Sequence, residues 1–235
     1  MFSMIITSHL AALGVIDMVA LGLIVGLWLL LGWLIEHPSA RRPSVTVLVA
    51  QRRRDWMKVF VTRDPRIFDS QILSSLRQGT SFFASTSIFA IGGVLALMGN
   101  TDPLRGVAAD VMQAATPTLV WQVKLGLVTL FLVTAFLKFV WSNRVFGYCS
   151  VLMAAVPQDP DHPDSYPLAA QAGELNVRAA MNFNRGLRAM YFALGALAWL
   201  IGAWAMIFAT VIVGWTIWSR EFASMPRRIL LGEVV

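Results

Sequence analysis

The sequence is poor in charge and in the residues from which most active sites are built. Only 14% of its 235 residues are Asp, Glu, Lys or Arg, and it has three histidines and a single cysteine, Cys149. One cysteine excludes an internal disulfide and a zinc site made of several cysteines. The chain also has no His-Glu-x-x-His, no phosphate-binding loop, no Gly-x-Ser-x-Gly and no haem-attachment motif. We therefore expect neither an enzymatic activity nor a cofactor.

Long apolar runs are what the chain has instead. Hydrophobic residues make up 57% of it, and its mean hydropathy is +0.66. The hydrocarbon core of a bilayer, about 30 Å thick, is crossed by about 20 helical residues. Segments of that length lie at residues 10–35, 80–98, 119–140 and 189–218. The sequence thus predicts an all-α integral membrane four-helix bundle, a single domain over residues 1–235, with cytoplasmic helix extensions and an interfacial amphipathic helix.

Basic residues are spread unevenly over the connections between these segments. Residues 36–79 carry nine Lys or Arg, residues 99–118 carry only Arg105, and residues 141–188 carry four. Because positive residues favour the cytoplasmic side, connections 36–79 and 141–188 are predicted to be cytoplasmic and both termini periplasmic, in a bacterial inner membrane. Three arginines near the C-terminus, Arg220, Arg227 and Arg228, fit this orientation less well.

The first connection contains an amphipathic helix. Apolar residues recur there on one helical face, and basic residues fall elsewhere. The apolar positions are Val45, Leu48, Val49, Trp56, Val59 and Phe60. The helix either lies on the membrane and binds anionic lipid, or packs on the cytoplasmic ends of the spans. The lipid contacts predicted by the first alternative are Arg52, Arg53, Arg54 and Lys58. The net charge of +6 serves orientation and lipid attraction, so we expect no nucleic-acid partner.

The third connection divides into a proline-rich turn and a long helix. Residues 157–167 hold metal-ligand types, but their spacing matches no calcium or zinc loop, so we predict a solvated turn and no metal. The residues in question are Asp159, Asp161, His162 and Asp164. Residues 175–218 contain no proline and read as one continuous helix, about 65 Å long at 1.5 Å per residue, whose first half stands in the cytoplasm.

Small and hydroxylated residues form stripes along the predicted spans. The second span carries Ser81, Ser85, Gly92 and Ala96 at helical spacing. Such stripes are typical of close helix packing. The alternative is a pore lined by hydroxyl groups of Ser81, Ser85, Thr86 and Ser87.

Three ionisable residues lie within the predicted spans, where a charge costs roughly 2.5 to 3.5 kcal/mol. Asp17 and Lys124 lie at matching depths from the outer surface, so we predict that they interact, either as a structural pair or as part of an ion or proton site. Lys138 lies at the inner end of the third span and can extend its ammonium group to the interface.

Three motifs carry a resemblance to a known family. They are Phe82-Phe83-Ala-Ser-Thr-Ser-Ile88 with Gly92-Gly93, Lys138-Phe-x-Trp-Ser-x-Arg144, and residues 179–191, Ala-Ala-x-Asn-x-Asn-x-Gly-Leu-Arg-x-x-Tyr. The chain resembles the bacterial membrane proteins called domain of unknown function 599. The resemblance implies four spans and no catalysis. It directs attention to Ser85, Thr86, Lys138, Arg144, Asn182, Asn184, Arg188 and Tyr191, which either join helix ends or line a pore or ligand site.

Two classes of function follow from these observations. The first is a homo-oligomeric channel or transporter, which intramembrane charge and a hydroxyl-rich second span favour. In that case Arg188 and Asn182, with Lys138 nearby, would surround a cytoplasmic vestibule and select anions. The second is a non-catalytic accessory subunit of a larger membrane complex, which the absence of chemistry and the nine tryptophans favour.

Overall fold

The computed structural model describes residues 13–100 and 118–233, and all regular structure in these ranges is helical. This confirms the all-α class. The helices are α2 (Val15–Glu36), α3 (Val45–Thr62), α4 (Ile67–Gly99), α6 (Thr118–Ala155), α7 (Ser165–Leu197), a 3-10 turn (Ala198–Leu200), α8 (Ala203–Phe222) and α9 (Met225–Leu230). Four segments are long and apolar enough to cross a membrane: α2, α4, α6 and Ala203–Leu230.

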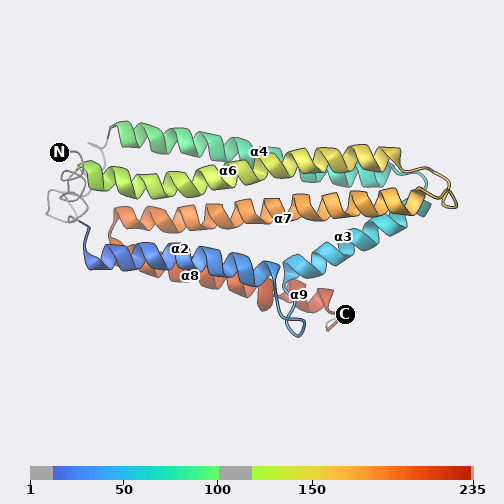
Figure 1. Cartoon of the computed structure of the whole chain (residues 1–235). Coiled ribbons are helices and arrows are strands. Elements are labelled where there is room, and N and C mark those ends of the chain that lie inside the picture. The colour runs from blue at the N-terminus through green and yellow to red at the C-terminus, as the bar shows by residue number, and fades with distance from the viewer. Residues whose placement is uncertain (1–12, 101–117, 234–235) are drawn as a thin grey trace.

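The long helices run side by side in alternating directions (Figure 1). α7 lies between a layer made by α4 and α6 and a layer made by α2 and α8. The most extensive packing is between α6 and α7, and the only extensive helix contact of α4 within the described residues is with α6. α4 is therefore at the edge of the bundle.

The predicted single helix over residues 175–218 is wrong. α7 ends at Leu197, a 3-10 turn follows, and after Gly202 (φ 161°, ψ 167°) helix α8 runs back antiparallel to α7. The reason is tertiary. A straight helix would leave its second half without partners, whereas the reversal buries Trp199 and Met206 in one core beside α2.

This reversal bears on the predicted position of the termini, which stays a prediction. α2 begins at the end of the bundle where α7 turns into α8, whereas α8 ends at the opposite end (Figure 1). If the bundle stands across the membrane, with α7 crossing beside the four candidate spans, the two ends of the described chain lie on opposite sides. The arginines of the C-terminal segment, including Arg227 and Arg228 of α9, now lie at the same end as the other basic connections. We propose that this end faces the cytoplasm, with α2 starting on the outer side.

Cysteine labelling tests this orientation. The native Cys149 is fully buried and should give no background signal. Cysteine at Ile201, which is 65% exposed in the α7–α8 turn, should react with an impermeant thiol reagent in intact cells. Cysteine at the exposed Met225 in α9 should react only after permeabilisation. Reaction of Met225→Cys in intact cells would instead support two outer termini.

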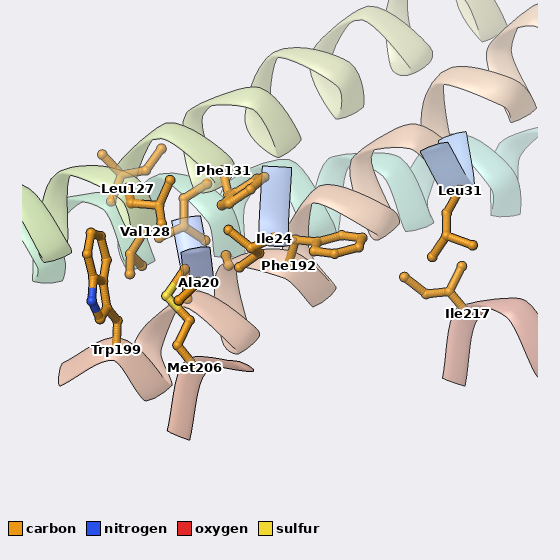
Figure 2. Close-up of a cluster of buried hydrophobic side chains, with 14 of the residues drawn as sticks. Ala20, Ile24, Leu31, Leu127, Val128, Phe131, Phe192, Trp199, Met206 and Ile217 are labelled. Atoms are coloured by element: carbon orange, nitrogen blue, oxygen red, sulfur yellow. The ribbon is translucent and has the colours of Figure 1, made fainter. Parts of the chain in front are cut away.

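Beyond α2 and α8, the helices continue into a second bundle. We call this the distal bundle: α3, residues 67–80 of α4, residues 142–155 of α6 and residues 165–181 of α7. Its core is separate from the core around α2, which Figure 2 shows, and includes Met57, Phe60, Leu73, Phe146 and Cys149. α4 and α7 continue through both bundles, as the predicted helix extensions require, and α6 does so as well, which was not predicted.

α3 packs on α7, as the second of the two alternatives for this helix predicts. Its Arg53 donates a hydrogen bond to Asn176, and Arg54 pairs with Glu174. The Arg54 guanidinium holds the pKa of the Glu174 carboxyl below its ordinary value. Two of the four residues predicted to bind lipid, Arg53 and Arg54, thus contact α7, while the side chains of Arg52 and Lys58 stay exposed. Lipid binding by these residues stays a prediction.

Candidate functional site

A buried ion-pair cluster lies where α2 ends. Glu36 is the last residue of α2, and Arg185 and Arg188 lie three residues apart on the facing side of α7. Arg185 Nε donates to Glu36 Oε1 at 2.8 Å, and Arg188 Nη2 donates to the same oxygen at 2.5 Å. The side chains of Glu36 and Arg188 are only 11% and 8% exposed. The cluster holds two positive charges and one negative charge at one depth.

A second polar group connects α3, α7 and α8 beside it. The Thr46 backbone N–H and hydroxyl donate to Glu221 at 3.0 and 2.9 Å, and Asn184 Nδ2 donates to the Thr46 hydroxyl at 3.4 Å. Arg220 donates to the hydroxyl of Tyr191, which joins α8 to α7. Asn184 and Tyr191 therefore join helices by hydrogen bonds, which is the first of the two roles that the sequence left open for them.

Lys138 lies in a pocket next to Glu36 and its arginines. The pocket has a volume of about 150 Å³ and lies between α2, α6 and α7. It is lined by Trp28, Leu29, Gly32, Trp33, Thr134, Lys138, Arg185 and Arg188. Within the described residues the ammonium group of Lys138 has no ion-pair or hydrogen-bond partner. The structure thus brings Lys138 and Arg188 together, as predicted, but around a lateral pocket and not around a central vestibule.

Asp17 and Lys124 lie at one depth, as predicted, but they form no ion pair. Trp199 stands between them: its Nε1 donates to Asp17 Oδ1 at 2.6 Å, and its ring centre lies 5.9 Å from Lys124 Nζ. Lys124 also lies over the ring of Trp121, at 5.5 Å. Sequence alone missed this arrangement because Trp199 reaches the site only through the α7–α8 reversal. Aromatic faces, and not a carboxylate in direct contact, stabilise the buried ammonium group.

The remaining predicted residues do not converge on one site. Asn182 donates to the carbonyl of Arg178 on its own helix, and Arg144 contacts the Tyr148 hydroxyl at 2.5 Å. Thr86 donates to the Phe82 carbonyl and is exposed.

The proline-rich turn, residues 157–167, is held by local bonds such as Ser165 Oγ to the Asp159 carbonyl at 2.6 Å. No group of three or more His, Cys, Asp or Glu able to hold a metal occurs in the described part of the chain.

A cleft in the distal bundle was not predicted. It has a volume of about 810 Å³ and lies between α4 and α6. The described residues that line it include two arginines and no acid. Arg66 is bound to the carbonyls of Val156 and Pro157, whereas Arg77 is exposed and its guanidinium has no partner in the described residues. The signal in the sequence is a polar stripe at helical spacing: Ser70, Ser74, Arg77, Gln78 and Ser81.

The four long apolar helices define the class: this is a multi-pass membrane protein. The chain belongs to the family described as "Protein of unknown function, DUF599", whose sequence model matches residues 19–226. This confirms the family resemblance drawn from the three motifs. No curated protein and no solved structure matches the chain.

Proposed function

We propose that the protein is a homo-oligomeric, non-catalytic membrane protein of the bacterial inner membrane whose copies meet on α4, and that anions pass between the copies. The observation that carries this proposal is the position and surface of α4. α4 is the edge helix and, within the described residues, packs extensively only on α6. Small and hydroxylated residues are exposed along it beside large apolar ones.

These residues form the predicted stripe. All four of these residues are exposed: Ser81, Ser85, Gly92 and Ala96. Ser81 also accepts a hydrogen bond from Asn143 of α6 at 2.7 Å, so Ser85, Gly92 and Ala96 are the positions left for a contact between copies. Small side chains let helix backbones approach closely, and hydroxyl groups can bond across the contact. The outward side of α4 is mixed, because it also exposes large apolar residues: Phe82, Ile88, Phe89 and Leu95. The outward side of α8 differs in that the exposed residues between positions 203 and 218 are all large: Trp204, Phe208, Val211, Ile212 and Trp215.

A path between copies agrees with the packing inside one copy. At the level of α2, side chains from four helices fill the interior, including Ile24, Phe131, Phe192 and Met206 (Figure 2). We do not propose a vestibule formed by Arg188 and Lys138, because Glu36 pairs with Arg188 in a buried cluster. Arg77 is the basic residue that we assign to anion selection. It lines the cleft that reaches Ser81, at the inner end of the stripe, and a fixed positive charge favours anions.

Cross-linking tests the assembly. Gly92→Cys and Ala96→Cys should form disulfide-linked dimers in membranes, since the stripe brings equivalent positions together. Phe208→Cys and Ile212→Cys on α8 are the matched controls, and the buried Cys149 should not cross-link. Native mass spectrometry of the wild type should show a symmetric oligomer. Equal cross-linking from α4 and α8, or a monomer, contradicts the proposal.

Conduction is a second readout of the same proposal. Liposomes containing the oligomer should pass chloride, and Arg77→Gln should lower the ratio of chloride to potassium permeability. Arg52→Gln, on the exposed side of α3, is the control and should leave the ratio unchanged. An oligomer without flux rejects conduction but keeps the assembly. A monomer that co-purifies with other subunits supports the accessory-subunit alternative.

A further inference from the structure

The pocket between α2, α6 and α7 has the composition of a phosphate site. Three basic side chains, Lys138, Arg185 and Arg188, line it, and the acid beside them, Glu36, offsets one of their charges. Glu221 on α8 also acts electrostatically on Arg188, so at least one positive charge of the lining is not offset. A partly buried cationic group without a partner is costly, so a site of this kind gains from an anion.

Among the described residues, several hydrogen-bond donors at this site have no partner. Arg185 uses Nε and Nη2 on Glu36, which leaves Nη1. Arg188 uses Nη2, which leaves Nη1 and Nε. Lys138 contributes all three N–H groups of its ammonium. Phosphate oxygens accept such charge-assisted bonds well, and arginine and lysine are the residues that bind them.

The surroundings indicate that the phosphate belongs to a lipid. Trp28, Trp33 and Leu29 supply the apolar part of the lining, and all three lie on the membrane-spanning helix α2. Tryptophan is enriched at the level of lipid headgroups. Basic pockets between spanning helices on the cytoplasmic side are suited to anionic headgroups. Free phosphate needs no apolar lining.

We propose that this pocket binds the headgroup phosphate of an anionic phospholipid, with Lys138, Arg185 and Arg188 as its ligands and Trp28 and Trp33 against the glycerol region and the start of the acyl chains. On the orientation proposed above, the lipid belongs to the cytoplasmic leaflet. The site is separate from α4, so it does not depend on the proposed function.

Two substitutions test the site without removing a protein contact. Lys138→Gln removes the charge that has no protein partner. Gly32→Leu fills the pocket, because a Cβ at position 32 would meet nothing within 4 Å. Both variants should fold normally. The matched control is Arg228→Gln, which removes one exposed positive charge from α9.

The measurement is native mass spectrometry of the detergent-purified protein titrated with phosphatidylglycerol, phosphatidylcholine or inorganic phosphate. We expect the wild type to bind phosphatidylglycerol more tightly than phosphatidylcholine. Lys138→Gln should bind phosphatidylglycerol about tenfold more weakly than the wild type does, and Arg228→Gln should bind it as tightly as the wild type. Gly32→Leu should lose the bound lipid although its charge is unchanged.

Each other outcome overturns a stated part of the proposal. Equal binding of both lipids, or equal losses in Lys138→Gln and Arg228→Gln, would show only general attraction to a basic surface. The pocket would be assigned to free phosphate by two results together. Millimolar inorganic phosphate would displace phosphatidylglycerol, and Gly32→Leu would still be fully occupied by phosphate.

Discussion

Glu36→Gln should destabilise the protein by about 3 to 5 kcal/mol, the cost of leaving a buried partner charge uncompensated. The substitution keeps the side-chain volume but leaves Arg185 and Arg188 as two cations at one depth, of which Arg188 is only 8% exposed. The measurement is the thermal midpoint in detergent. Glu36→Gln combined with Arg188→Gln should lose less than the sum of the single losses, because the second change removes the stranded charge.

Glu174→Gln is the control for that result. It breaks the pair with Arg54, whose side chains are 49% and 40% exposed, so the expected loss is below about 1 kcal/mol. Equal losses in Glu36→Gln and Glu174→Gln would show that the cluster at the end of α2 is no more important than a surface pair.

A small aromatic cluster around Phe139, with Ala135 and Ala189, separates the two cores, and we call it the joint between the bundles. Gly186→Ala should destabilise it by about 1 to 3 kcal/mol, the usual cost of overpacking. A Cβ at position 186 would lie 2.6 Å from Cε1 of Phe139. That ring cannot move freely, since it stacks on Phe83 at 5.4 Å and packs on Phe183 at 5.5 Å. The helix propensity gained by alanine, about 1 kcal/mol at most, does not offset the clash.

Gly126→Ala on α6 tests whether the loss at Gly186 is local. A Cβ there meets nothing within 4 Å, so this variant should unfold at or above the wild-type temperature. A Gly186→Ala protein as stable as Gly126→Ala would mean that the Phe139 ring moves aside without cost, and the joint would then be looser than its packing indicates.

The sequence predicted the elements that depend on local pattern. The spans in α2, α4 and α6 follow from apolar length, and α3 from helical periodicity. The break after Leu197 could not be predicted in this way, because Ala, Leu and Trp on either side are compatible with helix. The burial of Trp199 and of the α8 residues Met206 and Ile217 in the core beside α2 favours the turn, and those contacts do not exist until the helices are assembled.

The candidate site, too, was predicted only in part. Matching depths brought Asp17 and Lys124 to one level, but depth does not give rotational phase, so Trp199 between them was missed. Arg188 was placed in a vestibule because Glu36 was counted as part of a connection and not as a partner. An acid at the end of an apolar helix, facing two arginines three residues apart, is the signal that would have identified the cluster.

The turn between α7 and α8 has a consequence for biogenesis. α7 carries Glu174, Arg178, Arg185 and Arg188, and it is not among the helices apolar enough to cross a membrane alone. α8 is apolar enough, and its core residues pack against α7 and α2. The translocation machinery would therefore receive the two as a helical hairpin, in which α8 supplies the partitioning energy for both. A ribosome that stopped before residue 203 would leave α7 without the partner that brings it into the bilayer.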